Sequence, residues 1–121
     1  MIELLKDLED DLSEMFDIHF TKHELLDEAF TQASYVNEHP HQGLKFYERI
    51  EFLGDAVLQL VVSEYLYKRY PEMPQGKLTR LRAAMVCEAS FSDFAKECHF
   101  DRYIRLGKGE EKSGARQRPS L

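Results

Sequence analysis

The run from Leu44 to Tyr70 constrains the fold of this 121-residue chain more than any other segment. It contains no proline and a single glycine, Gly54, and apolar residues occur throughout it. Such a run predicts one helix of about 40 Å at 1.5 Å per residue, ended by Pro71 and Pro74. We therefore expect a fold built on one long central helix.

Most other apolar residues recur every three or four positions, which is the spacing of amphipathic helices. Thr21 and Glu24 form a capping-box pattern before one of these segments. Polar segments with glycine or proline predict an exposed loop at 37–43 and a mobile loop at 107–114. The fold class is therefore all-α, with further helices expected at residues 2–15, 22–30, 77–88 and 90–98.

Length and composition narrow the class of protein. With 121 residues, of which 43% are hydrophobic and 31% charged, the chain is expected to form one globular domain over residues 1–121. No apolar run approaches the roughly 20 residues of a membrane helix, and the acidic sequence after Met1 lacks a secretory leader pattern. We expect no membrane partner and a cytoplasmic location. Cys87 and Cys98 are then expected to be reduced thiols, although two cysteines also permit one disulfide.

The formal net charge of −6 disfavours a simple nucleic-acid binder, but the charge is unevenly distributed. Residues 1–28 hold ten acidic and two basic side chains, whereas the chain from Arg102 onward holds six basic and two acidic ones. A basic end can face phosphate groups, and a solvated tail is the other interpretation. The candidate phosphate contacts are Arg105, Lys108, Lys112, Arg116 and Arg118.

Three acidic residues mark one face of the expected long helix. At about 100° per residue, Glu48, Glu51 and Asp55 share a stripe about 60° wide. Two such charges roughly 6 Å apart repel by about 3 kcal/mol at an effective dielectric constant near 20. A divalent cation relieves this repulsion, and Mg²⁺ or Mn²⁺ commonly takes one or two carboxylates together with waters and phosphate oxygens. The stripe is therefore a candidate metal site.

The alternative is a solvated acidic face, partly compensated by Lys45 and Arg49. Two features favour the metal site. Apolar residues on both sides of the stripe leave little room for an extended solvated face. Gly54 costs about 1 kcal/mol relative to alanine within a helix, which suggests that another segment approaches closely there.

The stripe lies within a longer motif. The run Glu48-Arg49-Ile50-Glu51-Phe52-Leu53-Gly54-Asp55-Ala56-Val57-Leu58 closely resembles the signature helix of ribonuclease III. Segments 29–35, 76–83 and 106–114 resemble further elements of that family, so nearly the whole chain is covered. The resemblance implies a ribonuclease III endonuclease-like helical bundle. It also implies metal-dependent cleavage of double-stranded RNA that leaves 5′-phosphate and 3′-hydroxyl ends, in the processing of rRNA and mRNA.

The resemblance assigns roles within the motif. Glu51 corresponds to a direct metal ligand and Asp55 to the catalytic acid that holds the water network of the metal, so both are expected at a Mg²⁺ site where Mn²⁺ can substitute. Glu48 corresponds to an acid near the RNA. Phe52 corresponds to an aromatic residue that packs into a cavity of the partner subunit in a homodimer, whereas its position alone favours its own core.

The chain also departs from the family pattern. Gln75 stands where the family usually has Glu, and it is expected near the RNA with Lys108, Lys112 and Arg116. The family supplies a further Asp and Glu from a helix beyond its last loop, followed by a double-stranded-RNA-binding domain, and neither precedes the final residue, Leu121. We therefore expect a fold that is incomplete at its C-terminus and a fragment that is inactive alone, with dimer contacts or an exchanged segment covering the open face.

Two other functions stay open at this point. Gln75 and the absent acids favour a non-catalytic dimerisation module of the same fold, whereas the intact Glu48, Glu51 and Asp55 favour a ribonuclease. The third reading is an acidic helical adaptor with no RNA role. An adaptor should show no Mg²⁺- or Mn²⁺-dependent change in stability that disappears in Glu51→Gln.

Overall fold

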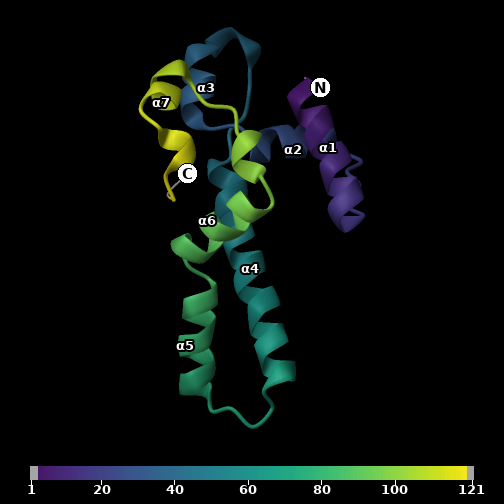
Figure 1. The fold of residues 1–121 in the computed structure, drawn as a ribbon, viewed down its shortest axis with the longest axis vertical. Coiled ribbons are helices and arrows are strands. Elements are labelled where there is room, and N and C mark those ends of the chain that lie inside the picture. The colour runs from purple at the N-terminus through teal and green to yellow at the C-terminus, as the bar shows by residue number, and fades with distance from the viewer. Residues whose placement is uncertain (1–2, 120–121) are drawn as a thin grey trace.

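The computed structural model describes residues 3–119 and consists of helices and their connections over that range (Figure 1). The all-α fold class is confirmed. Within the described range Thr31 and Arg105 form one isolated bridge, and no strand is present. The helices are α1 (Glu3–Phe16), α2 (His23–Ala29), α3 (Ala33–Glu38), α4 (Glu48–Arg69), α5 (Gln75–Met85), α6 (Glu88–Glu97) and α7 (Lys108–Lys112), with 3-10 turns at η1 (Pro40–Gln42), η2 (Phe100–Arg102) and η3 (Ala115–Gln117).

A small core lies where α1 meets α2 and the segment after η2. Leucines at helical spacing in α1 are buried there together with Leu26 and Tyr103, and Phe30 and Phe100 pack against this cluster. The hydroxyl of Tyr103 donates a hydrogen bond to the carboxylate of Asp11 on α1. The core therefore connects the N-terminal helix to a segment more than 80 residues further along the chain. The buried leucines of α1 in this core are Leu5, Leu8 and Leu12.

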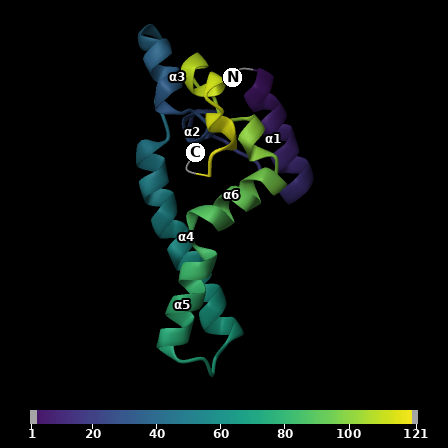
Figure 2. The ribbon, with the colours of Figure 1, turned by 60° about the vertical axis from the view of Figure 1, so that its left-hand side comes forward.

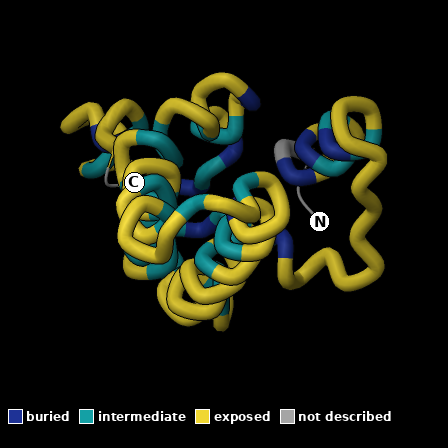
Figure 3. Tube along the Cα trace, turned by 90° about the horizontal axis from the view of Figure 1, so that it is seen from below, coloured by how far each residue is buried: buried dark blue, intermediate teal, exposed yellow. Residues whose placement is uncertain are grey.

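Helices α4 and α5 form an antiparallel hairpin that projects from the rest of the molecule (Figures 1 and 2). Leu66 of α4 is buried, and Arg82 of α5 donates through Nη1 to the hydroxyl of Ser63 over 2.9 Å. Seen from below, most of this hairpin is exposed (Figure 3). We call it the α4–α5 arm.

The long helix is shorter than the sequence predicts, since it begins at Glu48 and not at Leu44. Gly43 adopts a left-handed conformation at φ 61°, and the N–H of Tyr47 donates to the carbonyl of Thr31 over 3.0 Å. These features keep residues 44–46 outside the helix. The 22 residues of α4 span about 33 Å.

Other boundaries also differ from the expectations. Helix α5 begins at Gln75, directly after Pro74, and ends at Met85. Helix α6 begins at Glu88 because Cys87 before it is extended, at φ −143° and ψ 159°. The capping-box prediction for Thr21 is wrong: Lys22 occupies the N-cap of α2 without a side-chain hydrogen bond.

The expected mobile loop at 107–114 is also wrong, because α7 lies within it. Gly107 is buried at the start of α7 and donates its N–H to the hydroxyl of Ser34 over 2.9 Å. A Cβ atom on Gly107 would lie 2.8 Å from the carbonyl oxygen of Ser34, so only glycine allows α7 to approach α3 this closely. The 37–43 segment is largely exposed, as predicted, although η1 lies inside it.

Both cysteines, Cys87 and Cys98, are free thiols, as the sequence predicts. None of the helices within residues 3–119 is long and apolar enough to cross a bilayer. Ile2, expected to begin the first helix, and the final residue Leu121 lie outside the described range.

Candidate active site

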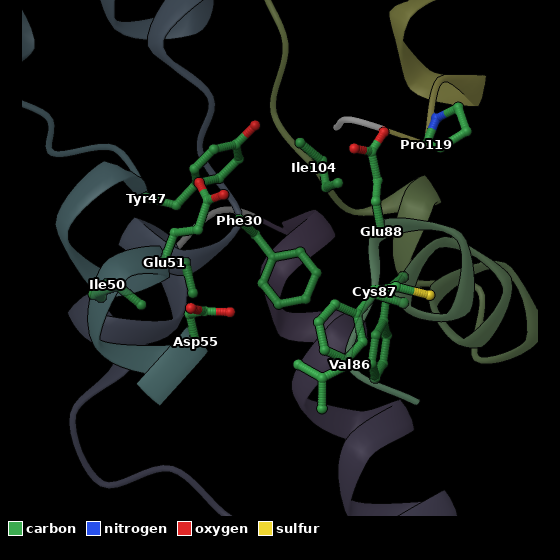
Figure 4. Close-up of a pocket in the computed structure, with 13 residues that line it drawn as sticks. Phe30, Tyr47, Ile50, Glu51, Asp55, Val86, Cys87, Glu88, Ile104 and Pro119 are labelled. Atoms are coloured by element: carbon green, nitrogen blue, oxygen red, sulfur yellow. The ribbon is translucent and has the colours of Figure 1, made fainter. Parts of the chain in front are cut away.

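Glu51 and Asp55 face the same cavity, one turn apart on α4 (Figure 4). The cavity has a volume of about 510 Å³. Its opposite side is formed at the junction of α5 and α6, where Val86, Cys87 and Glu88 lie. We call it the carboxylate pocket, and its remaining lining residues are Ala29, Phe30, Tyr47, Ile50, Phe91, Phe100, Ile104 and Pro119.

The packed border that the sequence predicts beside the acidic stripe is present only in part: Ile50 lines the pocket, whereas the other apolar residues around the stripe, Phe52, Leu53, Val57 and Leu58, are exposed. Phe30, Ile50 and Phe91 line the pocket beside the two carboxylates, while Glu51 and Asp55 themselves remain exposed to solvent. Glu48 is exposed and does not line the pocket. The structure therefore brings together two of the three acids in the stripe.

Tyr47 lies beside Glu51 in the pocket, directly before the signature motif. Its pKa is raised above the usual value, first because the phenol is partly buried and second because Glu51 and Glu110 are negatively charged nearby. The phenol therefore keeps its proton at neutral pH. Glu110 belongs to α7, so the charge of this one side chain reaches Tyr47 from a second helix.

Sequence reasoning missed Glu88, which faces the pocket from the opposite side (Figure 4). It is the first residue of α6, where the partial positive charge of a helix N-terminus favours an acidic side chain. Local sequence carries no signal that places Glu88 opposite Glu51, because their approach depends on how α6 folds back toward α4.

The donor set of the pocket fits a hard divalent cation. Glu51 and Asp55 offer carboxylate oxygens beside open space, and Mg²⁺ is commonly held by one or two carboxylates while waters fill its other positions. Over residues 3–119, no three Asp, Glu, His or Cys side chains gather closely enough to form a metal cage by themselves. The pocket thus fits a partly hydrated ion.

Phe52 points away from its own core and is 83% exposed. Other apolar side chains of α4 are exposed with it, including Leu53, Val57, Leu60 and Val61; we call these five residues the α4 apolar face. The expected close approach to Gly54 is wrong within this chain, because a Cβ atom there would meet nothing within 4 Å among the described residues. The exposed position of Phe52 also contradicts the core placement that its sequence position alone favours.

The predicted RNA-contacting residues do not gather at one place. Lys108 and Lys112 are exposed on α7, whereas Gln75 is exposed at the opposite end of the molecule, where α5 begins (Figure 1). Gln75 lines a separate small pocket with Leu66 and Arg82. An RNA-binding surface that includes both the α7 lysines and Gln75 would therefore extend from one end of the molecule to the other.

The structure contradicts the solvated-tail interpretation for Arg105 and Arg116, which are held in the fold by hydrogen bonds, whereas Lys108, Lys112 and Arg118 are exposed. Arg105 is only 9% exposed, donates to the Thr31 hydroxyl and lies 5.0 Å from the centre of the Tyr35 ring. Arg118 donates to Glu110 over 3.1 Å and to Ser113 over 2.8 Å. The buried position of Arg105 also argues against its role as a phosphate contact.

Comparisons with known proteins agree with the motif. A family model described as ribonuclease-III-like matches residues 22–121. The chain is 89% identical over 118 residues to ribonuclease 3 of Pediococcus pentosaceus and 75% identical over 118 residues to that of Limosilactobacillus reuteri. Each alignment covers 98% of this chain and 51% of the relative. The chain therefore spans about half the length of these curated relatives.

Solved structures show the same fold. The nuclease domain of ribonuclease III from Campylobacter jejuni matches with a TM-score of 0.81 and 36% sequence identity, over 92% of this chain and 73% of that one. That structure is described as showing flexibility in a region involved in dimer formation. A second structure of the same domain, at 2.2 Å resolution, matches with a TM-score of 0.79.

Proposed function

The chain belongs to the ribonuclease III family, and from this premise we propose that it is the endonuclease domain of an enzyme that cleaves double-stranded RNA. The proposed reaction is divalent-metal-dependent hydrolysis of phosphodiesters, which leaves 5′-phosphate and 3′-hydroxyl ends. We propose that the complete enzyme acts in the cytoplasm on rRNA and mRNA precursors. The relatives, which are about twice as long as this chain, are ribonucleases by name.

The carboxylate pocket carries the proposal. Glu51 and Asp55 face one cavity from adjacent helical turns, and we assign Glu51 to metal binding and Asp55 to metal binding and orientation of the metal's water network. Bound Mg²⁺, for which Mn²⁺ can substitute, would supply an activated water and neutralise the charge that develops on phosphate. The two carboxylates alone would repel an RNA backbone, so RNA approach depends on cations.

Basic residues outside the pocket supply part of that attraction. Lys108 and Lys112 are exposed on α7, whose Glu110 lies near enough to Tyr47 to affect its pKa. We assign both lysines to phosphate contacts, Glu48 to the edge of the RNA path and Gln75 to a contact at the far end of the arm. Salt is expected to weaken binding because phosphate contacts release counterions.

The α4 apolar face supports the proposal of a homodimer. Phe52 and Leu53, which lie beside Glu51, are 83% and 64% exposed, and large apolar side chains exposed next to one another are typical of interaction sites. A second copy of the chain presents the same face, as a two-fold symmetric interface requires. We propose that Phe52 packs against the partner and that two pockets then act on one duplex.

The experiment that tests this function is cleavage of a long RNA duplex with Mg²⁺ or Mn²⁺. It compares this chain with one extended to the length of the relatives, each with a Glu51→Gln variant and a Glu14→Gln control on α1. We expect the extended chain to cut and the 121-residue chain to be inactive, because its pocket offers only two of the expected carboxylate ligands. Metal-independent cutting by Glu51→Gln would contradict the assignment.

A non-catalytic dimerisation module is the second candidate. Gln75, which carries no charge, favours it. If the extended chain dimerises but neither cuts duplex RNA nor responds to metal, this second function replaces the first.

A further inference from the structure

Arg116 connects three parts of the chain through one guanidinium group. Its Nε and Nη2 atoms donate to the two carboxylate oxygens of Glu111, over 2.9 and 2.5 Å. Its Nη1 atom donates to the backbone carbonyls of Asp101, over 2.6 Å, and Ile104, over 2.9 Å. A guanidinium has five N–H groups, and bidentate bonds to a carboxylate are among its strongest. We call this set of contacts the Arg116 clamp.

The clamp lies directly behind one end of the carboxylate pocket. Ile104, whose carbonyl accepts from Arg116, also lines that pocket, and so does Pro119, three residues beyond Arg116. Figure 4 shows Ile104 and Pro119 near Glu88, across the pocket from Asp55. A smaller cavity of about 190 Å³ is lined by Arg116 and shares Phe91, Ile104 and Pro119 with the carboxylate pocket. The guanidinium therefore supports the wall opposite the carboxylates.

The charge of the pair is consistent with a persistent contact. The Glu111 carboxylate raises the pKa of Arg116, and the guanidinium lowers the pKa of Glu111, mainly through their hydrogen bonds. The side chain of Arg116 is 22% exposed and that of Glu111 is 50% exposed. An arginine that points into the protein in this way offers little to an RNA phosphate.

We propose that Arg116 is a positioning residue for the reaction of the carboxylate pocket, an inference that rests on the proposed function. Through the Ile104 carbonyl and the segment that leads to Pro119, it holds the pocket wall at a fixed distance from Glu51 and Asp55. This replaces the sequence-based assignment of Arg116 to RNA binding. Lysine cannot make the same bidentate contact, so Arg116→Lys is expected to lose the function.

Cys87 provides a native probe of this geometry. It lines the carboxylate pocket, whereas Cys98 is buried. The measurement is the rate at which a thiol reagent labels Cys87 in the 121-residue chain. It compares the unsubstituted chain with Glu111→Gln, Arg116→Gln, Arg116→Lys and the variant that combines Glu111→Gln with Arg116→Gln. Gln117→Ala, a change at an exposed position, is the control. We expect each single clamp variant to raise the rate about three- to tenfold. The double variant should add little, because both changes open the same contact.

Cleavage by the extended chain provides the second readout. Glu111→Gln and Arg116→Gln are expected to raise the Mg²⁺ concentration needed for half-maximal cleavage while leaving duplex affinity and its salt dependence unchanged. Lys112→Gln serves as the contrast, because loss of a phosphate contact reduces the salt dependence.

Three outcomes are distinguishable. Weaker duplex binding with reduced salt dependence in Arg116→Gln but not in Glu111→Gln would overturn the proposal in favour of a direct phosphate contact. Lower melting temperatures with wild-type labelling rates and Mg²⁺ requirements would also overturn it, since the clamp would then serve stability alone. If the unsubstituted extended chain cuts no duplex, the proposed function fails and the positioning role fails with it. Faster Cys87 labelling in the clamp variants would in that case still identify the clamp as a support of the pocket wall.

Discussion

Arg105 donates from both Nε and Nη2 to the hydroxyl of Thr31, 74 positions earlier in the chain, over 2.9 and 2.6 Å. The backbone makes the same link, because the N–H of Arg105 donates to Phe30 and its carbonyl accepts from Gln32. Thr31 is fully buried and Arg105 is 9% exposed. This contact joins the segment between α2 and α3 to the segment between η2 and α7. Phe30 and Ile104, the residues directly before Thr31 and Arg105, both line the carboxylate pocket.

Removing the Thr31 hydroxyl is therefore expected to destabilise the protein. Thr31→Val leaves two buried donors of Arg105 without their acceptor, a loss of about 1–3 kcal/mol in the free energy of unfolding. Urea denaturation followed by circular dichroism measures it. Thr31→Ser retains the hydroxyl and is the control. Equal stability of the Val and Ser variants would show that the hydroxyl does not hold Arg105.

Two glycines near α7 give a matched pair for a packing test. Gly107→Ala places a Cβ atom 2.8 Å from the Ser34 carbonyl oxygen, whereas Gly109→Ala places one where nothing lies within 4 Å among the described residues. We expect Gly107→Ala to lower the unfolding free energy by about 1–3 kcal/mol and Gly109→Ala to leave it unchanged or raise it slightly. Thermal melts of both variants decide this, and a stable Gly107→Ala protein would contradict the close approach of α7 to α3.

The exposed Phe52 predicts a change in assembly without a change in the fold. Phe52→Ala is expected to alter the unfolding free energy of the monomer by less than about 0.5 kcal/mol. It should weaken dimerisation about tenfold or more, as is common for a central aromatic contact. Sedimentation equilibrium measures the dissociation constant, with Phe16→Ala as a control outside α4. An unchanged dissociation constant would remove Phe52 from the proposed interface.

Tyr103 predicts a pH dependence of stability in the alkaline range. Its hydrogen bond to Asp11, together with burial and the charge of that carboxylate, raises its pKa to about 12 in the folded state, above the roughly 10 of a free tyrosine. The folded protein therefore holds this proton more tightly than the unfolded chain does. The resulting stabilisation is complete below pH 10 and is lost as the pH rises toward 12.

Denaturation of Tyr103→Phe between pH 8 and 12 tests this sign. The variant should lose less stability across pH 10–12 than the unsubstituted chain, while Tyr67→Phe, a change at a 74% exposed position, should follow the unsubstituted chain. Parallel curves for all three proteins would contradict the contribution of Tyr103.

The sequence predicted what depends on local spacing. Glu51 and Asp55 were correctly placed on one helical face, because positions four apart on a helix always share a face. It could not predict that α4 begins only at Glu48, since the Thr31 carbonyl that accepts from Tyr47 is 16 positions away. The same reason explains Arg105 and Arg116, which look like solvated tail residues until the acceptors of their hydrogen bonds are known. Glu88 also faces the pocket only through tertiary packing.

The most direct test of the metal-dependent site is the rate of duplex RNA cleavage as a function of Mn²⁺ concentration, measured for the extended chain with Asp55→Asn and with Glu14→Gln. The pocket assignment predicts that Asp55→Asn lowers the cleavage rate about hundredfold or more and that this variant still binds duplex RNA. Glu14→Gln should cleave at the rate of the unsubstituted chain. The products should carry 5′-phosphates. Cleavage by Asp55→Asn at the unsubstituted rate and with the same Mn²⁺ dependence would contradict the pocket assignment.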